Sequence, residues 1–214
     1  MVADFVSVSG AHDYLRERGI IPKYHIECDP RKHKGDMLTK LHRETEYMMA
    51  SCCHPEVVKK LVDRGKKVTL WHLDNGKGSK EHIEGMEPGA FLVSGGGCVG
   101  LRAVPLLMAM GYRRFIVHGM DFSYREGKTH AGGHTGKKTE QVEVDCGGKK
   151  FITAPVLLTY LHNFDMMRNL IGNPEADPIK IEMVIRGDGL LQHSLKYGGA
   201  AKAGPMPGTT KEAA

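Results

Sequence analysis

Three glycines in the stretch SGGGCVG have the spacing of a loop that holds a phosphate-bearing ligand. Gly95, Gly97 and Gly100 fit the pattern G-x-G-x-x-G, between an apolar run that predicts a strand (90–94) and one that predicts a helix (99–111). In dinucleotide-binding domains this spacing lets the backbone approach a pyrophosphate at the helix N-terminus, and an acid further along binds the ribose. Asp121 lies 21 residues beyond Gly100, in the place of that acid.

Three interpretations of the glycines stay open. A dinucleotide site normally opens its fold, whereas four candidate strands precede this motif and few residues remain for a substrate domain. A cradle for another phosphate group is the second interpretation, because amides at a helix N-terminus attract any anion. In the third, the glycines bind nothing and allow close packing of a helix on a sheet.

Polar side chains follow several predicted strands at the point where each strand ends. Asp29 follows the run 23–28, Asp121 and Ser123 follow 114–119, and Asp188 follows 179–185 between two glycines. The residues behind Asp29 are basic: Arg31, Lys32, His33 and Lys34. Because Mg²⁺ takes one or two carboxylates plus phosphate oxygens, Asp29 and Asp121 are the candidate ligands of a magnesium–phosphate site. The alternative is that both are simple turn residues.

Two histidines, His130 and His134, follow Asp121 in the segment HGMDFSYREGKTHAGGH. A zinc site is disfavoured, because the AGG between them opposes a helical i,i+4 geometry and no cysteine is suitably spaced. His130 is instead a candidate general acid or base, or a partner for a phosphate; the alternative is a solvated loop histidine. His118 lies inside a predicted strand and is expected to pack in the core.

The elements that must position these side chains alternate along the chain. We expect strands at 4–9, 23–28, 47–52, 67–73, 90–94, 114–119 and 179–185, and helices at 11–19, 55–65, 99–111 and 154–172. Alternation predicts an α/β fold, Rossmann-like, with a mainly parallel sheet and helices on both faces. A small β-hairpin is predicted in QVEVDCGGKKFIT. Residues 1–196 are expected to form a single domain, and 197–214 a disordered tail rich in Gly, Ala and Pro.

Composition narrows the class of protein. The chain has 214 residues, 41% hydrophobic and 26% charged, and a net charge of +5, which suits anionic ligands such as nucleotides. The basic residues are scattered, so dedicated nucleic-acid binding is not expected. The N-terminus lacks the pattern of a secretory leader, no run is long enough to span a membrane, and the five cysteines include no CxxC pair. We therefore expect a cytoplasmic location, reduced thiols and no membrane partner.

Taken together, four segments resemble one known family. GIIPKYHIECDPR, ASCCHPEVVKKL, FLVSGGGCVGLRAVPLLMAMGYRRFIVHGMDFSYREGKTHAG and RGDGLL are similar, in order and spacing, to the 6-hydroxymethylpterin diphosphokinase-like family over about residues 5–195. That family includes archaeal pterin diphosphokinases, the central domain of flagellin motility accessory proteins and phage-encoded members. It is also similar in structure to bacterial sialyltransferases that use CMP-sugars.

The resemblance implies a nucleotide-dependent transferase. In the pterin enzymes ATP and Mg²⁺ deliver a diphosphate to a pterin hydroxymethyl group. Carried onto this sequence, Asp29 matches the family's strand-end acid. Its second glycine turn is matched by Ser94, Gly95, Gly96 and Gly97. Its G-x-D-x-S…H-A segment is matched by Asp121, Ser123 and His130. The catalytic candidates are then Asp121, His130 and Asp29, and the nucleotide-binding candidates are the glycine turn, Ser123 and Asp188.

This chain departs from the family pattern at its start. It begins at DFVSVSGAHDYL, one strand later than is usual, without the Gly-x-Gly-Pro-Ser-Leu turn, and Ser9 stands where an Asn is common. Three functions are weighed: Mg²⁺-dependent diphosphate transfer from ATP, a sialyltransferase-like glycosyltransferase using a CMP- or other nucleotide-activated sugar, and a nucleotide-binding module without turnover. The partners expected are a nucleotide and a small-molecule or sugar acceptor, and a homo-oligomer would supply a missing edge strand.

Overall fold

The computed structural model describes residues 3–125, 140–171 and 180–197, and the backbone of 202–204. It falls into two compact units, Met1–Gly111 and Tyr112–Ala214, each of which is described by itself. The single domain expected over residues 1–196 stays a prediction.

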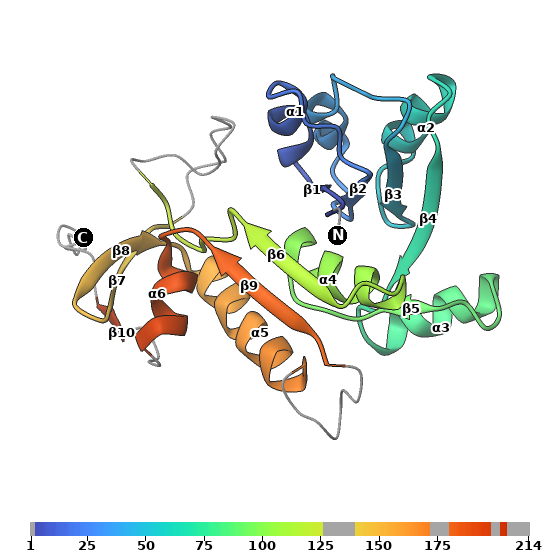
Figure 1. The fold of residues 1–214 in the computed structure, drawn as a ribbon. Helices are drawn as coiled ribbons and strands as arrows, with labels where there is room; N and C mark the ends of the chain where they lie inside the picture. The colour runs from blue at the N-terminus through green and yellow to red at the C-terminus, as the bar shows by residue number, and fades with distance from the viewer. Residues whose placement is uncertain (1–2, 126–139, 172–179, 198–201, 205–214) are drawn as a thin grey trace, which may run out of the picture. The chain divides into compact units, whose positions relative to one another are not determined.

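The first unit is a parallel five-stranded sheet with the strands in sequence order, β1-β2-β3-β4-β5 (Figure 1). The strands are β1 (Val6–Val8), β2 (Tyr24–Glu27), β3 (Glu46–Ala50), β4 (Val68–Leu73) and β5 (Leu92–Val93). In register, Val8 faces Ile26, Ile26 faces Met48, and Met48 faces Thr69. Each of these strands lies inside or within a residue of a run expected from the sequence.

Helices connect the strands of this unit. They are α1 (Ala11–Arg16), the 3-10 helix η1 (Lys32–Met37), α2 (Pro55–Asp63), α3 (Lys77–Met86) and α4 (Val99–Ala109). The start of α2 follows from its sequence, because Pro55 occupies the first turn and the His54 side chain accepts a hydrogen bond from the Glu56 amide. The sequence did not predict α3, which contains two glycines and buries only Ile83.

The sheet curls around α4. That helix contacts β5 at one edge and both β1 and β2 at the other, although four strand spacings of about 4.8 Å would separate the edges of a flat sheet. The connections all step in one direction, so right-handed crossovers place α1 and α2 on one face of the sheet. In Figure 1 these helices lie outside the curl and α4 lies inside it, as the expectation of helices on both faces requires.

The core of the first unit lies between α4 and the sheet. Leu101, Val104 and Leu107 of α4 are buried, as are Ile26 and Met49 of the central strands. Trp71 is also buried, and its indole N–H donates to the Met48 carbonyl at 3.2 Å. This packing fixes the carboxyl ends of the strands, from which the polar loops leave.

The second unit combines a parallel pair, β6 (Arg114–His118) with β9 (Glu182–Arg186), and a separate antiparallel sheet in the order β10-β7-β8. The predicted hairpin is confirmed: β7 (Val142–Cys146) and β8 (Lys149–Thr153) are joined by Gly147 and Gly148, both at positive φ. The helices are α5 (Pro155–Ile171) and α6 (Leu190–Tyr197). Contrary to expectation, His118 at the end of β6 is exposed rather than packed in the core.

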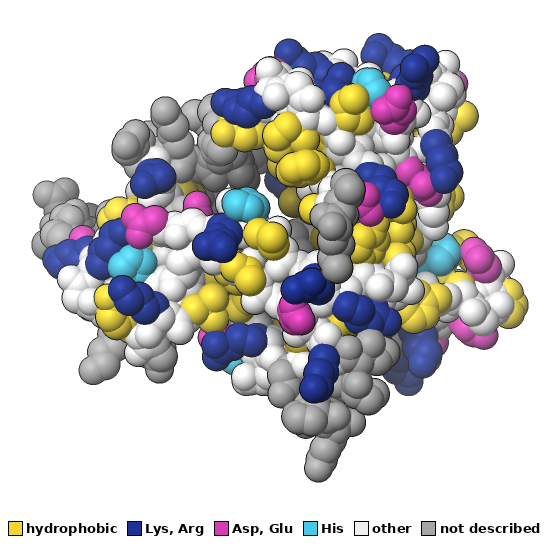
Figure 2. Space-filling model, in the orientation of Figure 1, with side chains coloured by type: hydrophobic (Ala, Val, Ile, Leu, Met, Phe, Trp, Pro, Cys, Tyr) yellow, Lys and Arg dark blue, Asp and Glu magenta, His cyan; other side chains and the backbone are white. Residues whose placement is uncertain are grey.

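Part of the predicted tail has secondary structure. Tyr197 ends α6, and β10 (Lys202–Gly204) pairs with β7; the other tail residues, 198–201 and 205–214, lie outside the described part of the chain. On the face drawn in Figure 2 the Lys and Arg side chains are scattered rather than gathered into one block. Among the described helices, none has the length and apolar character needed to cross a bilayer.

Candidate functional site

Five polar loops of the first unit leave the same edge of the sheet, because its five strands are parallel. These loops begin at Ser9, Cys28, Ser51, Asp74 and Ser94, after β1, β2, β3, β4 and β5 respectively. Ligands of open α/β sheets bind outside the carboxyl ends of the strands. We call this edge the carboxyl edge of the first unit.

The glycine turn at this edge, residues 94–97, is held by one arginine. Arg102 of α4 donates from Nε to the Gly96 carbonyl at 2.8 Å, and from its terminal nitrogens to the Asp74 carbonyl at 3.0 Å and to Asn75 Oδ1 at 2.7 Å. Gly95 has φ +155°, and a Cβ there would lie 3.3 Å from backbone and side-chain atoms of Arg102. Gly95 therefore serves close packing on α4, while Ser94 and Gly97 are exposed.

Asp74 joins the glycine turn to the end of β4. Its Oδ2 accepts a hydrogen bond from the Ser94 hydroxyl at 2.9 Å, and its Oδ1 accepts one from the Gly76 amide at 2.9 Å. The bond from the Gly76 amide has the larger effect and the bond from Ser94 the smaller one, and together they hold the pKa of Asp74 below its usual range. Sequence reasoning missed both Asp74 and Arg102. The available signal was the DNG that directly follows the predicted strand 67–73.

Asp29 lies at the same edge and is surrounded by cations. Arg31 donates from Nε to both carboxylate oxygens, at 2.8 and 3.0 Å, and Lys34 Nζ is 3.4 Å from Oδ2. Burial opposes ionisation of Asp29, but the bonds from Arg31 and the charge of Lys34 outweigh it and lower the pKa to about 2. Lys34 also donates to the Ser9 hydroxyl at 2.7 Å, so the first two loops meet at its ammonium group.

Glu27, the last residue of β2, holds the backbone of the Asp29 loop through hydrogen bonds. Its Oε1 accepts from the amides of Cys28 and Asp29, at 2.9 and 3.1 Å. The side chain is almost completely buried, and desolvation raises its pKa. This buried acid holds the backbone of the loop in place.

In the second unit, the segments GMDFS and RGDGLL meet at the carboxyl ends of β6 and β9. The Leu191 amide donates to the Asp121 carbonyl at 3.0 Å, and the Leu190 amide donates to the Ser123 hydroxyl at 3.1 Å, at the start of α6. Gly189 packs against Asp121 so closely that a Cβ there would lie 2.3 Å from the Asp121 Cβ. Asp121 Oδ1 is buried and has no hydrogen-bond partner among the described residues.

The other expected site residues fall in two groups. Asp188 is exposed and accepts from Lys149 Nζ at 3.0 Å and lies 3.2 Å from His193 Nε2, interactions that lower its pKa. His130 and His134 lie outside the described residues. Asp121 and Asp29 belong to different units, so each is considered in its own surroundings.

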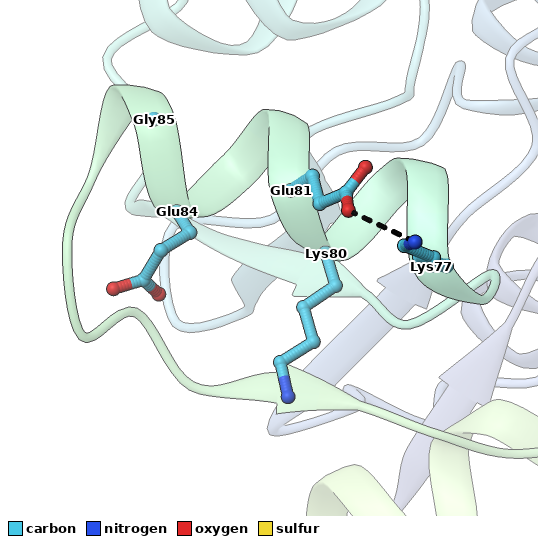
Figure 3. A pocket seen from close by; sticks show the side chains of 5 residues that line it. All are labelled: Lys77, Lys80, Glu81, Glu84 and Gly85. Atoms are coloured by element: carbon cyan, nitrogen blue, oxygen red, sulfur yellow. Dashed lines mark ion pairs between the residues drawn. The ribbon is translucent and has the colours of Figure 1, made fainter.

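Two surface hollows have lining residues other than the carboxylates, cations and glycine turn described above. One, of about 500 Å³, runs along α3 and is lined by Lys77, Lys80, Glu81, Glu84 and Gly85 (Figure 3). All its lining residues come from one helix, and Lys77 and Glu81 pair with each other at 3.7 Å, so no set of side chains converges there. The other, of about 430 Å³, lies in the second unit against Phe164, Met183 and Ile185.

The donor set at the carboxyl edge fits a metal ion only together with phosphate. Across residues 3–125, 140–171 and 180–197, no three His, Cys, Asp or Glu side chains converge as a metal site would need. Mg²⁺ requires only one or two carboxylates when a nucleotide supplies the other oxygens. In the first unit, Asp29 and Asp74 are the carboxylates that could bind Mg²⁺ together with a nucleotide. In the second unit, considered by itself, Asp121 has an oxygen without a partner among the described residues.

The first unit is therefore a Rossmann-like α/β fold whose carboxyl edge combines a glycine turn with carboxylates and cations. The model of a family described as 6-hydroxymethylpterin diphosphokinase MptE-like matches residues 5–127, more than half of the chain. The chain belongs to this family, as its sequence segments indicated.

A solved structure has a similar fold. The MAf glycosyltransferase from Magnetospirillum magneticum AMB-1 matches with a TM-score of 0.60 and 16% sequence identity. The match covers 91% of this chain and 32% of that one, so this chain spans about a third of its length. At this identity the similarity concerns the fold. The curated proteins contain no match.

Proposed function

We propose that this protein is a nucleotide-dependent transferase, and that its reaction is Mg²⁺-dependent transfer of diphosphate from ATP to a pterin-like hydroxymethyl acceptor. One observation carries the proposal: in a member of the MptE-like family, an exposed glycine turn, two carboxylates and the cations Arg31 and Lys34 share one edge of a parallel sheet. That combination suits the phosphates of a nucleotide.

The glycine turn is the proposed phosphate cradle. Ser94 and Gly97 are exposed beside the N-terminus of α4, whose first-turn amides favour negative charge. Arg102 keeps this backbone in place through the Gly96 carbonyl. Lys34, held between Ser9 and Asp29, supplies a fixed positive charge for a second phosphate.

Diphosphate transfer needs a nucleophile, a leaving group and charge neutralisation. The acceptor hydroxyl oxygen bonds to the β-phosphorus of ATP, the bond from that phosphorus to the α,β-bridging oxygen breaks, and AMP leaves. Bound Mg²⁺ would neutralise developing charge on the phosphate oxygens. Asp29 is its proposed ligand in the first unit, where the exposed Arg31 would turn from the carboxylate to a phosphate; Asp121 is a separate candidate ligand in the second unit. His130 is the proposed acceptor of the hydroxyl proton, and Ser123 and Asp188 are proposed nucleotide contacts.

Nucleotide binding is tested by the shift in melting temperature with ATP, CMP, a CMP-sugar and NAD, each with and without Mg²⁺. A ligand at about 100 times its Kd stabilises a protein by roughly 2.7 kcal/mol. We expect a Mg²⁺-dependent shift with ATP that Asp29→Asn reduces at least severalfold. Asp63→Asn, on the exposed surface of α2, is the matched control and should behave as the wild type. Absence of any ATP shift in the folded wild type would contradict the proposal.

A glycosyltransferase reaction with a nucleotide-activated sugar is the second candidate. Two observations favour it: the fold is similar to that of a glycosyltransferase, and two cations already neutralise Asp29, which lessens its need for a metal. Chelation separates the candidates, because EDTA should abolish diphosphate transfer and spare transfer from a CMP-sugar. Nucleotide binding without turnover of either donor would instead support the binding module.

A further inference from the structure

Four of the five cysteines lie at the carboxyl edge of the first unit. Cys28 follows β2, Cys52 and Cys53 follow β3, and Cys98 precedes α4; the fifth, Cys146, ends β7 in the second unit. All five are free thiols. The mechanism proposed above uses none of them, so their clustering calls for a separate account.

A tight turn presents Cys52 and Cys53 side by side. The Cys53 amide donates to the Ala50 carbonyl at 2.8 Å, which closes the turn. Cys52 Sγ donates to the Cys28 carbonyl at 3.2 Å, and Cys53 Sγ donates to the Glu27 carbonyl at 3.4 Å. Because the two acceptors belong to consecutive residues, both thiols lie against the end of the neighbouring strand, β2. Cys52 is exposed to solvent and Cys53 is 5% exposed.

The two thiols differ in their readiness to ionise. The neighbouring Cys53 side chain lowers the pKa of Cys52 to about 7 against the opposing effect of burial, and the charge of Arg102 adds to the lowering. The Cys52 side chain, together with burial, raises the pKa of Cys53. Burial raises the pKa of Cys28 to about 12 and also raises that of Cys98. Since the thiolate is the nucleophile, Cys52 is the thiol best placed to react first.

We propose that Cys52 and Cys53 form a reversible dithiol modification site, in which Cys52 attacks a low-molecular-weight disulfide and Cys53 completes a bond between the two neighbouring sulfurs. In the first step the Cys52 thiolate bonds to one sulfur of the disulfide, and the other sulfur leaves as a thiolate. In the second step the Cys53 thiol loses its proton to solvent and attacks Cys52 Sγ, which releases the remaining small thiolate. The pair is oxidised by two electrons, and the small disulfide is reduced to two thiols.

A bond between adjacent cysteines is easy to reverse. Consecutive Cα atoms are about 3.8 Å apart across a trans peptide, whereas bridged cysteines usually have Cα atoms about 4.4–6.8 Å apart. The resulting strain makes such a disulfide more reducible than an ordinary one. Oxidation also removes both S–H donors from the Glu27 and Cys28 carbonyls, directly before Asp29.

The test is incubation of the folded, reduced protein with oxidised glutathione, followed by alkylation and peptide mass mapping. In the wild type we expect loss of two hydrogen atoms in the Cys52–Cys53 peptide, without a lasting glutathione adduct and with recovery in dithiothreitol. Cys53→Ser should retain one glutathione on Cys52, and Cys52→Ser should leave Cys53 unmodified. Cys98→Ser, a substitution at the same edge that leaves the pair intact, should match the wild type.

Two results would overturn the inference. One is preferential modification of Cys28 or Cys98 over Cys52 in a protein whose circular dichroism shows it to be folded. The other is a glutathione adduct that persists on Cys52 in the wild type at the level seen in Cys53→Ser, because Cys53 would then not complete the bond. Both readouts are independent of nucleotide binding, so failure of the proposed transferase function leaves them unchanged.

Discussion

Arg102 Nε donates to the Gly96 carbonyl at 2.8 Å, so a helix residue fixes the backbone of the loop that precedes its own helix. The same guanidinium reaches the carbonyls of Asp74 and Val93 and the Asn75 side chain. It thereby joins the ends of β4 and β5 to the start of α4. None of these acceptors is a carboxylate, but the charge of Arg102 also acts on nearby Asp74 and Cys52, whose pKa values it lowers.

Replacing Arg102 should therefore loosen the glycine turn. In Arg102→Leu the carbonyls of Gly96 and Asp74 lose their donor, and we expect a loss of about 1–3 kcal/mol in the free energy of unfolding. ATP binding should weaken as well, since the turn is no longer held. Urea denaturation and calorimetric titration measure the two effects. Arg43→Leu, a change at a highly exposed side chain, is the control, and equal behaviour of the two variants would contradict the role given to Arg102.

Gly95 should not tolerate a side chain. Alanine at φ +155° is strained, and its Cβ would lie 3.3 Å from Arg102 Cα and from the Leu101 carbonyl oxygen. We expect Gly95→Ala to reduce stability by about 1–3 kcal/mol in thermal or urea unfolding. Gly78→Ala is the matched control, because Gly78 lies within α3 with open space around it; that change should leave stability unchanged or raise it by up to about 1 kcal/mol. A smaller loss at Gly95 than at Gly78 would refute this packing argument.

In the second unit, Gly189 should be more sensitive than its neighbour Asp188. A Cβ at Gly189 would lie 2.7 Å from Asp121 Cα and 2.8 Å from the Asp121 carbonyl oxygen, so the backbone must move. We expect Gly189→Ala to cost at least about 2 kcal/mol, as overpacking does. Asp188→Asn removes only exposed ion pairs and should cost under about 1 kcal/mol. Unfolding monitored by circular dichroism measures the loss of stability in both variants. A larger loss in Asp188→Asn than in Gly189→Ala would show that the loop adapts freely.

Stability should fall as the pH drops below about 6.5, because His25 is buried in its neutral form. Burial, followed by the nearby His12, lowers the pKa of His25 from 6.5 to about 3; Asp13 opposes this shift and Lys34 adds to it. Between these two values the unfolded chain binds a proton that the folded chain does not. The contribution of His25 is thus complete above pH 6.5 and decreases by up to about 1.4 kcal/mol per pH unit on acidification.

The contribution of His25 is isolated by comparing urea unfolding of the wild type and His25→Asn from pH 7.5 to 4.5. Asparagine retains a group near the Ser7 hydroxyl, which lies 3.1 Å from His25 Nδ1. We expect the variant to have a distinctly shallower dependence of the free energy of unfolding on pH. Glu27, whose raised pKa acts in the opposite direction above pH 4.5, is common to both proteins and cancels in the comparison. Parallel curves would disprove the assignment to His25.

Local patterns in the sequence were sufficient to predict most of the elements. Apolar runs bounded by glycine and proline predicted β1 to β6, β9, α2, α4 and α5, and two consecutive glycines predicted the β7–β8 turn. These signals are local because backbone preference and side-chain periodicity act over a few residues. The 3-10 helix η1 and the helices α3 and α6 were missed; α3 holds two glycines and α6 buries few apolar side chains.

By itself, then, the sequence determined the α/β class and the family. It also placed Asp29 and the glycine turn at the carboxyl ends of strands. Only the tertiary structure decided which groups meet there: that Arg102 holds Gly96, that Asp74 pairs with Ser94, and that Cys52 and Cys53 lie against β2. These pairs come from separate loops whose approach depends on strand order and on the curl of the sheet around α4. Such contacts arise from the packing of the whole unit, and no short stretch of sequence encodes them.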